Sequence, residues 1–132
     1  MDFAHAYEGL WRSYMQGISL GDPDWLAALF AEDGVILGPG GDPVIGRAAI
    51  RAYQFQHLQA YEFELEMHTA ETEDLGRRGW GYGTFAMVLR PRDGSAPTKV
   101  TGKYLNIVQP REDGTLEIVR HCWNADQGVP QL

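Results

Sequence analysis

The sequence predicts a single α+β domain, residues 1–132, in which helices come first and a curved antiparallel sheet follows. Two observations predict this order. Up to about residue 60 the apolar residues recur with the 3.6-residue period of helices, whereas from Tyr61 onward apolar and polar residues alternate as in strands. Near the C-terminus, Asp113-Gly114 stands between two alternating runs, which is a strong signal for a β-hairpin.

The helical half carries its own start and stop signals. Asp2 can cap a first helix, which Gly21 ends, and Asp22-Pro23 supplies a cap and a first-turn proline for a short second helix. A third helix is expected from Arg47 to about Ala60. The first helix has a single apolar stripe, made of Phe3, Ala6, Tyr7, Leu10, Trp11, Tyr14, Met15 and Ile18.

The remaining chain reads as strands. Val35–Leu37 is a short apolar strand, and Tyr61–His68 alternates apolar residues with glutamates, as a strand with one wet face does. Gly79–Arg90 has three glycines on one face, which let a strand bend and leave room above it. Lys103–Gln109 and Leu116–Asn124 form the C-terminal hairpin.

Composition narrows the classes of partner. A net charge of −7 disfavours nucleic acid, whose phosphate backbone calls for a clustered basic face. No apolar run is long enough to span a membrane, and the acidic, amphipathic N-terminus is unlike a signal peptide. The single Cys122 excludes an internal disulfide, so a cytoplasmic location is expected. The four histidines are scattered without ligand spacing, so we expect neither a metal nor another cofactor.

Most of the chain resembles one superfamily. The run GDPDWLAALFAEDGVILGPGGDPVIGRAAI, the glycine-rich strand, GKYLNIVQ and DGTLEIVRHCWNAD resemble nuclear transport factor 2-like proteins, in particular SnoaL-like and ketosteroid-isomerase-like bacterial proteins. The resemblance implies a cystatin-like, cone-shaped barrel whose three N-terminal helices close the concave face of the sheet over a deep apolar pocket. It also implies a homodimer through the convex face. There Trp80, Tyr82, Tyr104 and Val108 would otherwise form an exposed patch.

Strand alternation, oriented by this resemblance, predicts the residues that face the pocket. They are Phe85, Met87, Leu89, Lys103, Leu105, Ile107, Val119, His121 and Trp123. The steroid isomerase residues are mostly absent. Tyr14 falls on the position of the family's oxyanion-binding tyrosine, but the position of the base aspartate reads Gly38 and that of the second acid reads Lys103. Steroid isomerase activity is therefore not expected.

Three residues are the catalytic candidates: His121, Tyr14 and Lys103. A histidine ordinarily titrates near neutral pH, so His121 suits a general base or acid. Tyr14 can bind an oxygen, and an inward Lys103 suits a base, a Schiff-base amine or an anion anchor. Each has a structural alternative: a core tyrosine, a lysine that reaches the rim of the pocket, and a histidine bonded to a backbone carbonyl.

Trp25, His57, Phe85 and Trp123 are the ligand-binding candidates, although a structural place in the wall is favoured for His57. The leading hypothesis is a small-molecule pocket protein with acid–base chemistry of isomerase, cyclase or dehydratase type, acting on an apolar carbonyl- or hydroxyl-bearing ligand. The alternative is a non-catalytic ligand-binding or dimeric interaction module. Fold alone does not separate them, because one fold hosts many functions.

Overall fold

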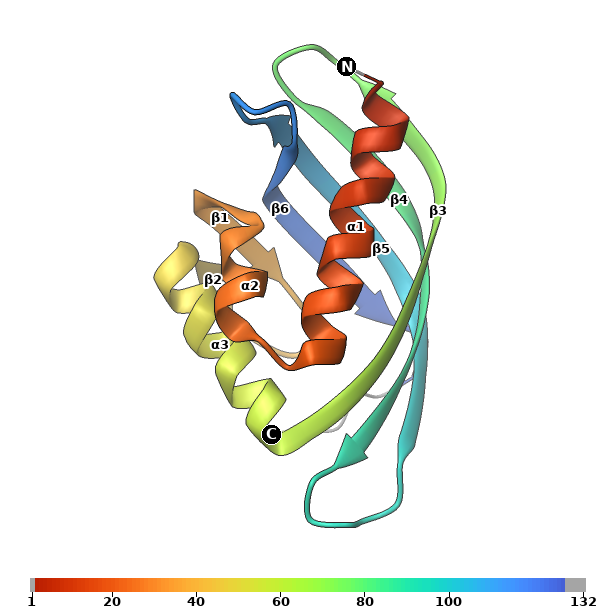
Figure 1. Ribbon diagram of the computed structural model, residues 1–132. Coiled ribbons are helices and arrows are strands. Elements are labelled where there is room, and N and C mark those ends of the chain that lie inside the picture. The colour runs from red at the N-terminus through yellow and green to blue at the C-terminus, as the bar shows by residue number, and fades with distance from the viewer. Residues whose placement is uncertain (1, 128–132) are drawn as a thin grey trace.

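The computed structural model describes residues 2–127 and confirms the α+β class (Figure 1). The single domain expected over residues 1–132 thus includes Met1 and residues 128–132, which lie outside the described part. The elements in chain order are α1 (Phe3–Leu20), α2 (Pro23–Ala28), β1 (Phe30–Leu37), β2 (Val44–Ile45), α3 (Arg47–Ala60), β3 (Tyr61–Asp74), β4 (Gly79–Pro91), β5 (Thr98–Pro110) and β6 (Leu116–Ala125).

The predicted helix signals act as expected. The side chain of Asp2 accepts a hydrogen bond from the backbone N–H of His5 at the start of α1, and Gly21 ends that helix in the left-handed conformation with φ 65°. Asp22 caps α2 in the same way, accepting from the N–H of Trp25. These caps satisfy backbone groups that would otherwise lack partners at the helix ends.

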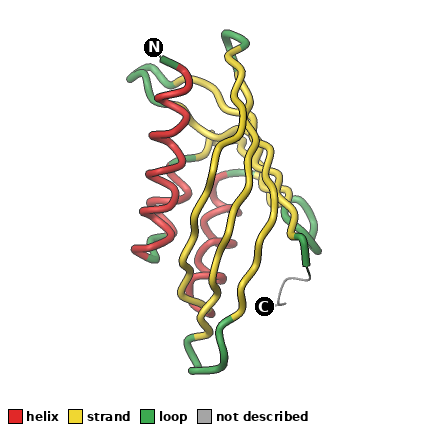
Figure 2. Tube along the Cα trace, turned by 90° about the vertical axis from the view of Figure 1, so that its right-hand side faces the viewer, coloured by secondary structure: helices red, strands yellow, loops and turns green. Residues whose placement is uncertain are grey.

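The six strands form one open, strongly bent sheet in the order β2-β1-β6-β5-β4-β3. The sheet is mixed rather than wholly antiparallel, because β1 runs parallel to β6 while the other neighbours are antiparallel. Figures 1 and 2 show all three helices on the concave side, with α1 lying along the sheet. Among the described residues, no helix is long and apolar enough to cross a membrane.

Glycines on β4 allow α1 to approach the sheet closely. A β-carbon at Gly79 would lie 2.4 Å from the ring of Phe3, and one at Gly81 would lie 2.4 Å from the ring of Tyr7. Side chains at these positions would collide with α1, so the glycine face provides the space that its aromatic stripe fills. The stripe continues from Tyr7 to Trp11, whose rings lie 6.1 Å apart.

A bulge in the final hairpin decides which face of β5 is buried. Val108 pairs with Ile118, but the next pair is Ile107 with Arg120, so one residue, Val119, is inserted into β6. A regular hairpin would continue with Leu105 opposite His121. The inserted residue instead places Asn106 opposite His121.

The predicted inner face is therefore correct on β4 and β6 and wrong on β5. Tyr104, Asn106 and Val108 are buried, whereas the other face of β5, with Lys103, Leu105 and Ile107, is exposed. A shift of one residue turns every side chain of a strand to the opposite face, which explains the error. The apolar residues of the convex face are Trp80, Tyr82, Leu105 and Ile107, not Tyr104 and Val108.

Candidate functional site

A cavity of about 370 Å³ lies between the helices and the concave face of the sheet. Its floor is apolar and comes from β3 and β4, while polar side chains reach it from α1, α3 and β6. The lining residues are Tyr14, Ile18, Ile36, Pro39, Gly40, Gly41, Tyr53, Gln54, Gln56, His57, Tyr61, Phe63, Leu65, Met67, Phe85, Met87, Leu89, Tyr104, His121 and Trp123.

His121 is a deeply buried titratable group of this wall, at 5% exposure. Its Nδ1 lies 2.5 Å from Oδ1 of Asn106, and Nδ2 of Asn106 donates to the hydroxyl of Tyr7 at 3.2 Å. Since an amide oxygen only accepts, the imidazole carries its proton on Nδ1, and Nε2 keeps a lone pair. The imidazole packs among the rings of Trp11, Tyr14 and Phe30, at centroid distances of 5.2, 5.8 and 6.4 Å.

Burial lowers the pKa of His121 from 6.5 to about 4, because the apolar surroundings disfavour the charged imidazolium. The residue is therefore neutral at pH 7. Asn106 fixes the tautomer and the orientation of the imidazole without adding a charge. Such a hydrogen bond to one ring nitrogen determines the protonation of the other nitrogen, which is then available to a ligand.

Tyr14 enters the same cavity from α1. Its hydroxyl accepts a hydrogen bond from Nε2 of Gln54 on α3, at 3.3 Å, and both side chains are buried. Burial raises the pKa of Tyr14 to about 12, so the phenol keeps its proton. A hydroxyl that accepts from Gln54 retains its own O–H as a donor, which can be directed at an oxygen in the cavity.

The mouth of the cavity carries a second group of polar side chains. His57 stacks on Tyr53 of the same helix, with ring centroids 4.1 Å apart, and its Nδ1 lies 2.8 Å from the backbone oxygen of Tyr53. Burial lowers the pKa of His57 and raises that of Tyr53, so both are neutral at pH 7. Trp123, two residues after His121 on β6, lies edge-on to Phe85 beside them.

The expectation that Lys103 faces the cavity is wrong. Lys103 pairs with Thr84 and Asn124 on the exposed face of the sheet, and its amine forms an ion pair with Asp126 there. Its side chain is 57% exposed and lies on the opposite face from His121. The charged amine thus stays in water and avoids the cost of burial.

Trp25 also lies away from the cavity. Its Nε1 donates to the backbone oxygen of Ser13 at 2.9 Å, so it ties α2 to α1 and is partly exposed. The other candidates, Tyr14, His57, Phe85, His121 and Trp123, all line the cavity. Arg47, at the start of α3, donates through Nε and Nη2 to the backbone oxygen of Phe30, which fixes the start of α3 to β1.

Two polar residues of the site were missed by the sequence analysis: Asn106 and Gln54. Gln54 lies on α3, whose weak apolar stripe does not show which polar residues turn inward. Asn106 falls on the buried face only because of the bulge at Val119. The glycines of β4 could have revealed the buried face of β5. Asn106 pairs with Gly81 and Tyr104 pairs with Gly83, so these two residues share the face of the sheet on which the glycines lie.

A known protein family matches most of this chain. The SnoaL-like domain family matches residues 11–121, which is most of the chain and includes both Tyr14 and His121. The chain belongs to the SnoaL-like family. This SnoaL-like protein is therefore a member of the nuclear transport factor 2-like superfamily. No curated protein matches the chain.

Solved structures with the same fold have low sequence identity to this SnoaL-like protein. A conserved protein from Planctomyces limnophilus superposes with a TM-score of 0.86 at 20% identity, over 92% of this chain and 94% of that one. A ketosteroid isomerase-like protein from Erwinia carotovora gives 0.82 at 15% identity, over 92% and 94%. A candidate scytalone dehydratase from Novosphingobium aromaticivorans gives 0.85 at 17% identity, over 96% and 89%. At these identities the likeness shows the fold alone.

Proposed function

We propose that this SnoaL-like protein binds an apolar small molecule and performs acid–base chemistry on its carbonyl or hydroxyl group without a cofactor. The observation that carries the proposal is the buried His121, whose Nδ1 is held by Asn106 at 2.5 Å in the wall of the cavity. A histidine in this state has one free lone pair and one fixed orientation, which are the requirements of a general base. The isomerase and dehydratase names among the structural neighbours support the same class of reaction.

The proposed steps follow from the two central residues. Nε2 of His121 takes a proton from the acidic C–H next to a carbonyl group of the ligand, and the electron pair of that bond moves toward the carbonyl oxygen. Tyr14 donates a hydrogen bond to the oxygen as its negative charge develops. The imidazolium then returns the proton, either to another carbon in an isomerisation or to a departing hydroxyl in a dehydration.

The low basicity of His121 is compatible with this role. A ketosteroid isomerase works with an aspartate base whose pKa is about 4.6, because its oxyanion-binding groups lower the energy of the enolate. The pKa of His121, about 4, is similar. The difference lies in charge, because His121 becomes a cation beside the new anion, so the two charges form a pair in a dry site.

The second candidate function is a non-catalytic binding or dimeric interaction module. Two observations favour it. Forming an imidazolium beside the neutral Asn106 is costly, since no carboxylate of the described lining residues would stabilise it. In addition, the convex face exposes Tyr82, Leu105 and Ile107, a patch that a second copy of the chain would cover.

A general proton-abstraction reaction separates the two candidates. In 5-nitrobenzisoxazole a base removes the C3 proton while the N–O bond breaks, giving a nitrile and a coloured phenoxide, so neither a cofactor nor the natural substrate is needed. We expect the wild type to accelerate this elimination and His121→Asn to lose about 10²-fold or more of the acceleration. Asparagine is the right replacement, because its amide N–H can still reach Asn106 while Nε2 is lost.

Tyr14→Phe provides the second arm of this experiment. Without the hydroxyl the developing phenoxide loses a donor, and the rate should fall while His121 and its link to Asn106 remain. A wild-type protein that shows no acceleration over buffer, or a His121→Asn variant as fast as the wild type, contradicts the catalytic proposal. The binding-module function would then stand.

A further inference from the structure

Gly38 lies beside two hydrogen-bond donors at the wall of the cavity. A β-carbon built on this residue would lie 3.1 Å from Nε1 of Trp123 and 3.5 Å from the hydroxyl oxygen of Tyr53. Two hydrogen-bond donors, one from β6 and one from α3, therefore lie next to the same residue, just beyond the end of β1. The adjoining Pro39 lines the cavity, so this residue lies at the cavity wall.

Both donors retain a proton to give. An indole N–H can only donate, and burial raises the pKa of Tyr53, so its phenol stays protonated. Within residues 2–127, neither Trp123 Nε1 nor the Tyr53 hydroxyl has a hydrogen-bond partner. Such a pair matches an oxygen that accepts two hydrogen bonds, as a carbonyl oxygen does.

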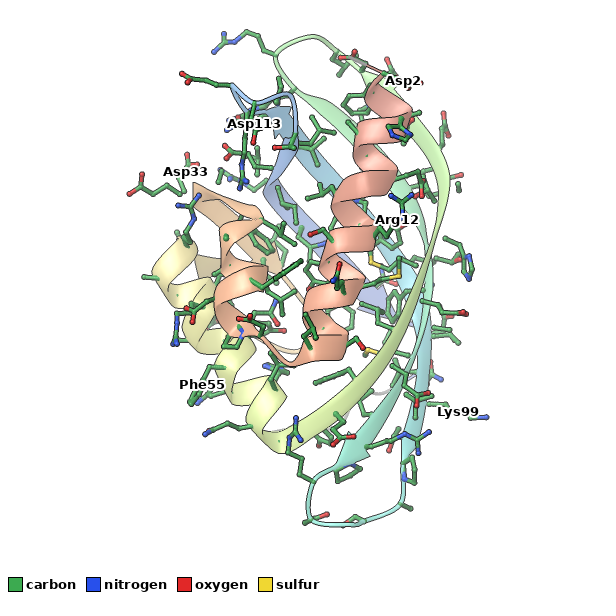
Figure 3. All side chains as sticks on the ribbon, viewed as in Figure 1. Asp2, Arg12, Asp33, Phe55, Lys99 and Asp113 are labelled. Atoms are coloured by element: carbon green, nitrogen blue, oxygen red, sulfur yellow. The ribbon has the colours of Figure 1, made fainter. Side chains whose placement is uncertain are left out.

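The charge of the cavity limits which oxygen fits. Among the described lining residues none is Asp, Glu, Lys or Arg, and both lining histidines are neutral at pH 7. Charged residues lie elsewhere on the surface, as Lys99 does, whose exposed side chain projects away from the molecule (Figure 3). A carboxylate in the cavity would lose its hydration without gaining a cation, so a neutral ligand is favoured.

We propose that Tyr53 and Trp123 form an oxygen-binding subsite beside Gly38, which takes the carbonyl oxygen of an uncharged ligand. This inference rests on the proposed function, because it assumes that the same ligand places its hydroxyl or acidic C–H end at His121. His121 and Trp123 are two residues apart on one face of β6, roughly 7 Å along the strand. The ligand class is thus a neutral, rigid hydroxy-ketone, with an acceptor at the mouth and a donor at the depth of the cavity.

Two naphthols of similar shape test the subsite. In 6-acetyl-2-naphthol the carbonyl can accept from Tyr53 and Trp123, whereas 6-isopropyl-2-naphthol fills the same space without an acceptor. The measured quantity is the ratio of their dissociation constants, obtained by calorimetry. Tyr53→Phe and Trp123→Phe should each shift this ratio about fivefold against the ketone, as expected for one neutral hydrogen bond. Partial unfolding of a variant would weaken the apparent binding of both ligands by the same factor, so the ratio of their dissociation constants would not change.

Two glycines supply a matched pair of variants. Gly38→Ala puts a methyl group between the two donors and should abolish the preference for the ketone, whereas Gly9→Ala on α1 meets no atom within 4 Å, is not among the residues that line the cavity and should keep it. Gly38 and Gly9 have ordinary backbone φ values, so alanine strains the backbone at neither position. A ratio that none of the Tyr53, Trp123 and Gly38 variants changes overturns the subsite and leaves the proposed function standing. If neither naphthol binds the wild type, the subsite proposal falls, while the elimination reaction decides the proposed function separately.

Discussion

The burial of His121 makes the stability of the protein depend on pH in a defined window. In the unfolded chain the imidazole takes up a proton as the pH falls through 6.5, whereas in the folded protein it resists protonation until about pH 4. The unfolded state therefore gains protons first, and the stability that His121 contributes is complete above pH 6.5 and is lost as the pH falls toward 4. At 1.36 kcal/mol for each pKa unit, the full effect is roughly 3 kcal/mol.

Urea unfolding at pH 7 and pH 4.5 measures this effect. We expect the wild type to lose about 2 to 3 kcal/mol more unfolding free energy between these pH values than His121→Asn does, since the variant lacks the titrating group. The pKa of His57 is lowered as well, so the comparison is cleanest when both proteins also carry His57→Gln. Histidine nitrogen NMR should show the Nδ1–H tautomer of His121 from pH 7 to 5, as its bond to Asn106 requires.

Equal losses of stability in the wild type and in His121→Asn would refute the argument. They would mean that the imidazole is protonated in the folded state at the same pH as in the unfolded chain. A tautomer with its proton on Nε2 would refute the geometry separately, because Nδ1 would then be unable to donate to Asn106. The general-base proposal depends more on the tautomer of His121 than on the pH at which its imidazole is protonated.

Three further predictions concern positions outside the catalytic pair. Gly81→Ala should destabilise the fold by about 1–3 kcal/mol in urea unfolding, because its β-carbon would lie 2.4 Å from the ring of Tyr7. Gly9→Ala, in the middle of α1, meets no atom within 4 Å and should stabilise the fold by about 0.5–1 kcal/mol. Lys103→Ala should leave the elimination rate and the naphthol ratio unchanged, and a change in either would contradict its place on the outer face. Light scattering should give a dimer mass for the wild type and a monomer mass for Leu105→Glu, while a wild-type monomer would refute the interface.

Much of the fold follows from local features of the sequence. Asp2 and Gly21 mark the ends of α1 because capping and the left-handed conformation are properties of single residues. The alternation after Tyr61 predicts β3, whose register on β4 then follows the pattern of the side chains. Motif order along the chain was enough to indicate the SnoaL-like family, since that order reflects the whole topology.

The site was predictable only where one element decides the direction of a side chain. Tyr14 lies on the apolar stripe of α1 and faces inward for that reason alone. His121 faces inward with its strand neighbour Val119, as alternation predicts. Trp25 could not be placed in this way, because the short helix α2 has few apolar positions, and its indole finds its partner, Ser13, on another helix.

The sequence by itself determined the helices, every strand except the two-residue β2 and the inward direction of His121, while the tertiary structure decided what lies beside that histidine. Both faces of β5 are compatible with burial, because each mixes apolar and polar residues. A single inserted residue, Val119, shifts the pairing by one, so that Asn106 lies opposite His121 and Lys103 turns to solvent. The position of a bulge depends on how the sheet bends around α1. That bend depends on side-chain packing between residues far apart in the sequence, so no local pattern reveals it.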